Sequence, residues 1–102
     1  MTEITETLLN QMGGANRIAV MTGAQIVTGE IYAMLVFKKQ TGARKFTHFK
    51  VQYNEGTDTY DIFTSRMSRK TYQYADTGVI GDVYAEDLKR VCEELTGLYF
   101  SF

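Results

Sequence analysis

The chain has 102 residues, of which 44% are hydrophobic and 23% charged, and its formal net charge is −1, values typical of one globular domain. With one cysteine and one histidine, it lacks the ligands for a structural zinc site, a haem or an iron–sulfur cluster, and it has no partner for an internal disulfide. We therefore expect no metal and no cofactor, and the lone cysteine favours a reducing cytoplasm.

The sequence gives no membrane or export signal. The longest apolar run, residues 31–37, is much shorter than a bilayer span. The chain begins Thr2-Glu3-Ile4-Thr5-Glu6, which is acidic where a signal peptide is basic. We expect no membrane partner.

Residues 3–12 predict an amphipathic helix, because apolar side chains recur at helical spacing from Ile4 to Met12 and a glycine pair follows at Gly13. The apolar run at 17–21 has the length and boundary of a short strand. We predict a strand there, although periodicity alone does not distinguish it from a buried helical turn.

Residues 31–37 are apolar at odd and even positions alike, as in a strand that is covered on both faces. This run predicts the central strand. A glycine-containing connection at 39–44 leads to a second strand at 45–53. Phe46 is out of phase with the apolar stripe of that strand. Either the strand begins after Phe46, or a bulge shifts the register, or Phe46 and His48 lie exposed on the second face.

A turn at 54–58 precedes a strand at 59–67, and the polar stretch 68–81 predicts the end of a strand followed by a loop. The last element is an amphipathic helix with Asp82 at its N-cap and Gly97 after its last turn. Its apolar stripe consists of Tyr84, Leu88, Val91, Cys92 and Leu95. The apolar tail 98–102 is expected to fold onto the core or against a partner.

These elements predict a single α+β domain over residues 1–102. It comprises an N-terminal helix, an antiparallel β-meander of three to four strands and a C-terminal amphipathic helix packed on the sheet. Helices on one side of the sheet are expected to form the core with it.

Three segments carry a resemblance to a known group of proteins. They are residues 13–24 (Gly-Gly-Ala-Asn-Arg-Ile-Ala-Val-Met-Thr-Gly-Ala), Tyr60-Asp61, and the segment from Val83-Tyr84 to Thr96-Gly97-Leu98-Tyr99. In this order they resemble small uncharacterised proteins of bacteriophages, prophages and other mobile elements. The resemblance implies a source in such an element and assigns no activity to individual residues.

Candidate catalytic groups are few. Cys92 with His48 is the best nucleophile and base, but Cys92 lies on an apolar helical stripe, where a small buried hydrophobe is expected. Asp58 and Asp61 fit a solvated hairpin end better than an acid–base pair. The Thr22-Gly23-Ala24 turn could present N–H groups to an anion, although a plain turn is favoured. We therefore expect no catalytic residue and no enzyme.

Charge is unevenly distributed along the chain. Residues 38–70 carry eight basic residues against three acidic ones, while residues 1–37 and 71–102 have net charges of −2 and −4. The bases are Lys38, Lys39, Arg44, Lys45, Lys50, Arg66, Arg69 and Lys70. Interleaved with Phe46, His48, Tyr53, Tyr60 and Tyr72, they could bind single-stranded nucleic acid. Alternatively, they protect a sheet edge while the aromatic side chains form the core.

The acidic helices suggest a different partner. A small phage protein can occupy a basic channel or regulatory surface of a host or defence-system protein, as an inhibitor such as an anti-CRISPR or other anti-defence protein does. The expected contacts are Asp76, Asp82, Glu86, Asp87, Glu93 and Glu94. We expect this function first and nucleic-acid binding as the alternative. An unpaired sheet edge and the aromatic tail also favour a homodimer.

Overall fold

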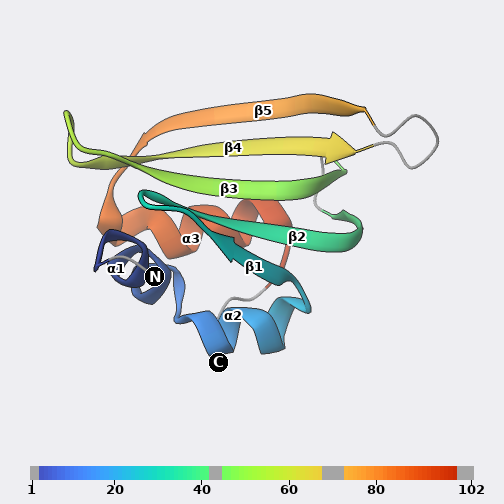
Figure 1. Cartoon of the computed structure of the whole chain (residues 1–102), viewed down its shortest axis with the longest axis horizontal. Helices are drawn as coiled ribbons and strands as arrows, with labels where there is room; N and C mark the ends of the chain where they lie inside the picture. The colour runs from blue at the N-terminus through green and yellow to red at the C-terminus, as the bar shows by residue number, and fades with distance from the viewer. Residues whose placement is uncertain (1–2, 42–44, 68–72, 99–102) are drawn as a thin grey trace.

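The computed structural model describes residues 3–41, 45–67 and 73–98, which form three helices and five strands (Figure 1). In chain order these are α1 (Glu3–Met12), α2 (Ala15–Thr22), β1 (Gln25–Thr28), β2 (Tyr32–Thr41), β3 (Phe46–Asn54), β4 (Thr59–Met67), β5 (Tyr74–Val83) and α3 (Ala85–Thr96). The predicted α+β fold is confirmed, although the meander has five strands rather than three or four.

The strands pair in chain order, and every pair is antiparallel. The central strand is β3, so the prediction of a central strand at 31–37 is wrong. That run forms the first part of β2, in which Ala33, Leu35 and Phe37 are buried and the residues between them only partly so. Apolar residues at both parities therefore do not mark a strand covered on both faces.

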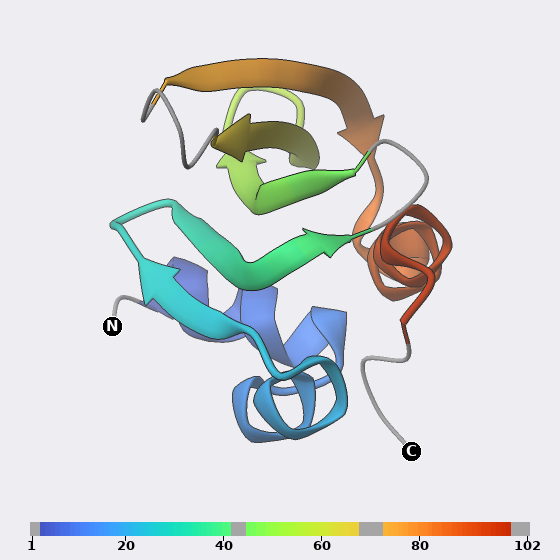
Figure 2. The same cartoon turned by 90° about the vertical axis from the view of Figure 1, so that its right-hand side faces the viewer.

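Helices α1 and α3 contact each other and pack against the sheet, α1 on β2 and α3 on β4 and β5 (Figures 1 and 2). Between the helices and the sheet lies the core, whose largest fully buried apolar side chains are Phe46, Phe49, Leu8, Leu9, Met12, Ile18, Leu35, Ile62, Leu88 and Val51. Removal of these side chains from water is the main stabilising contribution. We call the opposite face of the sheet the open face.

Residues 17–21 lie in helix α2, so the prediction of a strand there is wrong. Gly13 and Gly14 have φ angles of 132° and 96°, which allow the chain to leave α1 and begin a second helix at once. Ile18 is buried, whereas Val20 is 74% exposed. A short apolar run fits a helical turn as well as a strand, and here one side of the turn contacts the core.

Phe46 is fully buried, which decides among the three alternatives for its strand. The pairing of β2 with β3 shifts register between Val36 and Thr41, as a β-bulge requires. The Phe46 ring centroid lies 6.1 Å from that of Phe37 and 5.5 Å from that of Phe49. The bulge alternative is confirmed.

Residues 74–83 form β5, so the prediction of a loop is wrong for this part of 68–81, and residues 68–72 lie outside the described ranges. Asp76, Gly78 and Gly81 give the segment a low strand propensity. It nevertheless pairs along β4, with two shifts in register. Main-chain pairing with a formed neighbour outweighs local propensity here.

Helix α3 begins at Ala85, with Tyr84 as its N-cap, so the assignment of Asp82 to that position is wrong. Asp82 lies in β5 with a φ of 58°, and its N–H donates to Asp61 Oδ1 (3.3 Å). Tyr84 is 60% exposed and does not belong to the buried stripe. The strand continues to Val83, which leaves Asp82 no helix to cap.

The C-terminal part of α3 follows the prediction. Gly97 has a φ of 70° and donates its N–H to the Glu93 carbonyl (2.9 Å). Leu88 and Cys92 are buried, and Leu98 packs against the core. Residues 99–102 of the predicted tail lie outside the described ranges.

Candidate binding surfaces at the two ends of the sheet

The meander sorts acidic and basic residues to opposite ends of the sheet. In an antiparallel meander the first and third connections lie at one end and the second and fourth at the other (Figure 1). The first and third connections carry Glu30, Glu55 and Asp58. Lys38, Lys45 and Arg66 lie beside the second and fourth. The protein therefore has an acidic end and a basic end.

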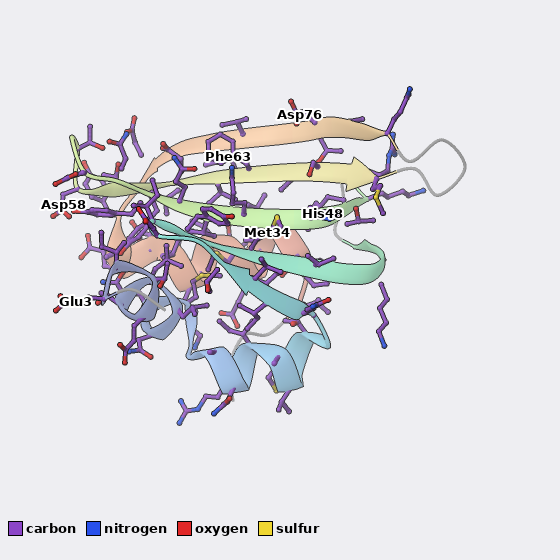
Figure 3. The ribbon with its side chains drawn as sticks, in the orientation of Figure 1. Glu3, Met34, His48, Asp58, Phe63 and Asp76 are labelled. Atoms are coloured by element: carbon purple, nitrogen blue, oxygen red, sulfur yellow. The ribbon has the colours of Figure 1, made fainter. Side chains whose placement is uncertain are left out.

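The acidic end comprises seven carboxylates: Glu3, Glu30, Glu55, Asp58, Asp61, Asp82 and Glu86. Glu3 and Asp58 line one pocket together with Ala85, the first residue of α3. The Tyr53 N–H donates to the Ile31 carbonyl (2.8 Å), which places the turn containing Glu30 beside the end of β3. Figure 3 shows Glu3 and Asp58 at the same end of the molecule, away from His48.

The basic end comprises Lys38, Lys45 and Arg66, all exposed. It also holds one exposed acid, Asp76, which pairs in register with Ser65 beside Arg66. The Met67 N–H donates to Thr47 Oγ1 (3.0 Å), which holds the end of β4 beside the start of β3. Of the other predicted nucleic-acid contacts, Arg44, Arg69, Lys70 and the Lys39 side chain lie outside the described parts of the chain. Two adjacent hairpins thus supply the basic end.

Lys50 lies within the sheet and not at the basic end. Its Nζ is 4.8 Å from the Phe63 ring centroid and 5.5 Å from that of Tyr32, within cation–π range. Strand register places Lys50 in a row on the open face with Val27, Met34, Phe63 and Val79. The two rings beside Lys50 are therefore in contact with its ammonium group.

The aromatic residues predicted to interleave with the bases do not form a surface on the open face. Phe46 and Tyr60 belong to the core, Tyr53 packs against it, and Tyr72 lies outside the described ranges. His48 is on the open face but only 9% exposed, with Nδ1 2.8 Å from Thr47 Oγ1. Burial lowers the pKa of His48, which is therefore neutral at pH 7.

The predicted acidic surface of α3 is divided. Asp82 and Glu86 belong to the acidic end, whereas Arg90 lies 3.4 Å from Asp87 and 3.2 Å from Glu94. Hydrogen bonds to Glu94 and then Asp87 raise the pKa of Arg90. Glu93 is half-buried. The guanidinium offsets the negative charge of α3 beyond its first turn.

A pocket of about 380 Å³ opens at the acidic end. Its lining comes from α1, the β3–β4 hairpin and the start of α3: Glu3, Ile4, Thr7, Gln11, Tyr53, Asp58, Tyr60 and Ala85. This volume is near the lower limit of ligand pockets, about 300 Å³, so it suits a small group better than a large cofactor. A larger pocket of about 680 Å³ lies between α1 and α2. Its charged lining residues are one acid, Glu6, and one base, Arg17, so it favours neither anionic nor cationic ligands.

Both tyrosine hydroxyls of the 380 Å³ pocket donate hydrogen bonds within the protein. Tyr53 donates to Asp58 Oδ1 (2.7 Å), and Tyr60 donates to Gln11 Oε1. The hydrogen bond to Asp58 raises the pKa of Tyr53, and burial raises that of Tyr60. Both hydroxyls therefore keep their protons at neutral pH and hold their acceptors in place.

The candidate nucleophile and base lie on opposite sides of the sheet. Cys92 is fully buried in α3 beneath the core face, and burial raises the pKa of its thiol. His48 lies on the open face, paired in register with Val36 and Ser65. The arrangement brings no base to the Cys92 thiol.

The other candidate groups have local structural roles. Thr22 donates to the Ile18 carbonyl (2.6 Å) and accepts from the Ala24 N–H (3.2 Å), at the C-terminus of a helix and not after a strand. Asp58 and Asp61 bind different partners, as described above. Within the described ranges, no three His, Cys, Asp or Glu side chains are grouped so as to hold a metal ion.

Comparison of the chain with protein-family models, curated proteins and solved structures finds no match. In the described ranges no helix is both long and apolar enough to cross a membrane. The candidate site therefore rests on geometry alone. Sequence reasoning missed Glu3 and Gln11, although the spacing of Glu3, Thr7 and Gln11 places them on one face of α1, and it assigned Tyr53 to the basic surface instead.

Proposed function

We propose that this chain is a non-catalytic accessory protein of a bacteriophage or other mobile element, which acts in the host cytoplasm by binding a host or defence-system protein. In this proposal it is an inhibitor or modulator, and its contact surface is the acidic end. The observation that carries the proposal is the grouping of seven carboxylates from four parts of the chain at the acidic end, where two of them, Glu3 and Asp58, line a pocket. The resemblance to mobile-element proteins supports the source.

The physical basis is electrostatic complementarity. Proteins that handle nucleic acid present basic channels, and a surface of one charge sign accelerates encounter with its opposite. Six of the seven carboxylates, Glu3, Glu30, Glu55, Asp58, Asp82 and Glu86, are exposed, and Asp61 is half-buried. Their mutual repulsion in the free protein is relieved when a cationic partner binds.

Nucleic-acid binding through the basic end is the second candidate. The observation in its favour is the adjacency of the β2–β3 and β4–β5 hairpins, which brings Lys38, Lys45 and Arg66 to one end of the sheet. Against it, the Tyr32 and Phe63 rings on the open face are already in contact with the Lys50 ammonium group, so they are poorly placed to stack with bases. Phosphate contact without base stacking would give weak, sequence-independent binding.

Fluorescence anisotropy with two labelled probes separates the candidates. One probe is an oligolysine peptide and the other a single-stranded oligodeoxynucleotide, each titrated at low and at physiological salt. We expect the peptide to bind, with an affinity that falls as salt rises, and the oligonucleotide not to bind. Tight oligonucleotide binding with a steep salt dependence, and no peptide binding, would replace the proposal by nucleic-acid recognition.

A further inference from the structure

The pocket at the acidic end has a hydrogen-bonding character that its charge alone does not reveal. The Tyr53 proton is donated to Asp58 and the Tyr60 proton to Gln11, so neither hydroxyl proton is available to a ligand. Each hydroxyl oxygen can still accept a hydrogen bond from a ligand through its lone pairs. The second carboxylate oxygen of Asp58 and both carboxylate oxygens of Glu3 are acceptors as well.

Few side-chain donors remain among the described residues of the same lining. Thr7 has a rotatable hydroxyl, and Gln11 has an amide NH₂ group beside the oxygen that Tyr60 occupies. The other side-chain contacts, from Ile4 and Ala85, are apolar. A ligand that satisfies these side chains brings several hydrogen-bond donors and a positive charge.

The aromatic rings add to this preference. The Tyr53 and Tyr60 ring centroids are 5.6 Å apart, at an interplanar angle of 55°, and both residues line the pocket. Tyrosine rings attract cations through their faces, and the alkyl stem of a long basic side chain packs well on apolar surface. Carboxylates beside tyrosines therefore fit a charged head on an apolar stem.

The β3–β4 turn fixes the position of the Asp58 carboxylate. Asp58 has a φ of 52°, a left-handed conformation that Asp and Asn tolerate better than most residues. In the same turn Asn54 Oδ1 accepts the Gly56 N–H (3.1 Å). With Tyr53 held to Oδ1, Oδ2 is left to a ligand. Such preorganisation lowers the entropic cost of binding.

We infer that this pocket binds one cationic side chain, a guanidinium or alkylammonium group, of the partner protein. The inference rests on the proposed function, since it specifies how the acidic end recognises a basic protein. The surrounding carboxylates attract a basic surface at long range, and the pocket selects one side chain of that surface at contact. Truncation of such an anchored side chain commonly has a large effect on affinity.

The test uses the full ¹⁵N-labelled chain and Nα-acetyl-L-arginine amide. The matched control ligand is Nα-acetyl-L-citrulline amide, which has nearly the same shape and no charge. We expect the arginine probe to shift the amide resonances of Thr7, Gln11, Asp58 and Ala85 in a saturable way. The citrulline probe should bind about tenfold more weakly, because hydrogen bonds to charged groups are stronger than neutral ones. Equal binding of the two probes would overturn the inference.

Two substitutions with the same chemical change localise the effect. Asp58→Asn removes the pocket carboxylate and keeps a residue that tolerates the turn conformation. Asp61→Asn removes one charge from the same end, outside the pocket. We expect about tenfold weaker arginine binding for Asp58→Asn and a change of at most about twofold for Asp61→Asn. Resonances of Lys45 and Arg66, at the opposite end of the sheet, report that the fold is retained.

Other outcomes have distinct meanings. Equal losses in both variants, with oligolysine binding retained, would refute the pocket and leave the acidic end as a diffuse electrostatic surface. Tighter binding of free spermidine than of Nα-acetyl-L-arginine amide and the oligolysine peptide would also refute a protein side chain as ligand. Failure of both oligolysine and arginine to bind would refute the proposed function together with the inference.

Discussion

The two ends of the sheet differ in charge and in how they are held together. At the acidic end, α1, the β3–β4 hairpin and the start of α3 meet around a pocket, and Tyr53 and Tyr60 form side-chain hydrogen bonds there. At the basic end two hairpins lie side by side, joined by the bond from the Met67 N–H to Thr47. The acidic end is thus built from two helices and a hairpin around a pocket, whereas the basic end is built from strands and their hairpins.

The comparison also shows why net charge per segment misleads. The +5 charge of residues 38–70 suggested a basic meander between acidic helices. In three dimensions the third connection of that meander, with Glu55 and Asp58, lies at the opposite end from Lys38 and Lys45. Alternate connections of a meander lie at the same end of the sheet. The charges of alternate turns should therefore be added together, and not those of one continuous segment.

Charge reversal at the two ends is expected to have the largest effect. The triple variant Glu3→Lys, Glu55→Lys, Glu86→Lys should bind oligolysine on the order of a hundredfold more weakly at low salt, because steering and contact charges are lost together. The matched variant Lys38→Glu, Lys45→Glu, Arg66→Glu should bind at least as tightly as wild type. Anisotropy titrations measure both, and equal weakening in the two variants would remove the distinction between the ends.

Thr47→Val probes what holds the basic end. It removes the hydroxyl that accepts the partly buried hydrogen bond from the Met67 N–H and also pairs with His48 Nδ1, and it should lower the free energy of unfolding by about 1–2 kcal/mol. Thr7→Val, at an exposed position of α1, is the control and should change it by less than about 0.5 kcal/mol. Urea denaturation gives both values. Similar values for the two variants would mean that the Thr47 hydroxyl does not stabilise the basic end.

Tyr60→Phe probes the acidic end in the same way. Loss of the hydrogen bond to Gln11, which links β4 to α1, should lower the free energy of unfolding by about 1 kcal/mol. Tyr53→Phe loses a hydrogen bond to an exposed partner, and its effect should be smaller. The reverse order in urea denaturation would show that the Tyr53–Asp58 pair, and not the link to α1, stabilises this end.

The smallest expected effect is the pH dependence contributed by His48. Burial lowers its pKa in the folded state below the ordinary value of 6.5, so the unfolded chain binds more protons below that pH. The free energy of unfolding is therefore unaffected by titration of His48 above about pH 6.5. It decreases as the pH falls from there through the pKa of His48 in the folded state. His48→Gln should therefore show a flatter decline in unfolding free energy from pH 7 to 5. An identical decline in both proteins would assign it to other groups.

Much of the fold could be predicted from the sequence, because several elements have a clear period and clear ends. Helix α1 and the strand 59–67 have the predicted boundaries. Residues 17–21 were too few to distinguish helix from strand. β5 was missed because its glycines and Asp76 suppress local propensity, and its pairing with β4 is a non-local interaction.

The candidate site was less accessible to sequence reasoning. Asp82 and Glu86 were predicted as contacts and lie at the acidic end, whereas Glu93 and Glu94 lie farther along α3, where Arg90 contacts Glu94. The pocket combines α1 with the β3–β4 hairpin, and no local pattern reports that contact. The spacing of Tyr53 and Asp58 across a turn is the one signal that could have indicated their hydrogen bond.

The most direct measurement is chemical-shift mapping on the ¹⁵N-labelled chain with the oligolysine peptide and, separately, with the single-stranded oligonucleotide. If the acidic end is the recognition surface, the peptide will perturb the amides of Glu3, Asp58 and Ala85, and those of Lys45 and Arg66 will stay in place. Perturbation centred on Lys45 and Arg66 by the oligonucleotide, with no response of the acidic end to the peptide, would contradict the proposed function.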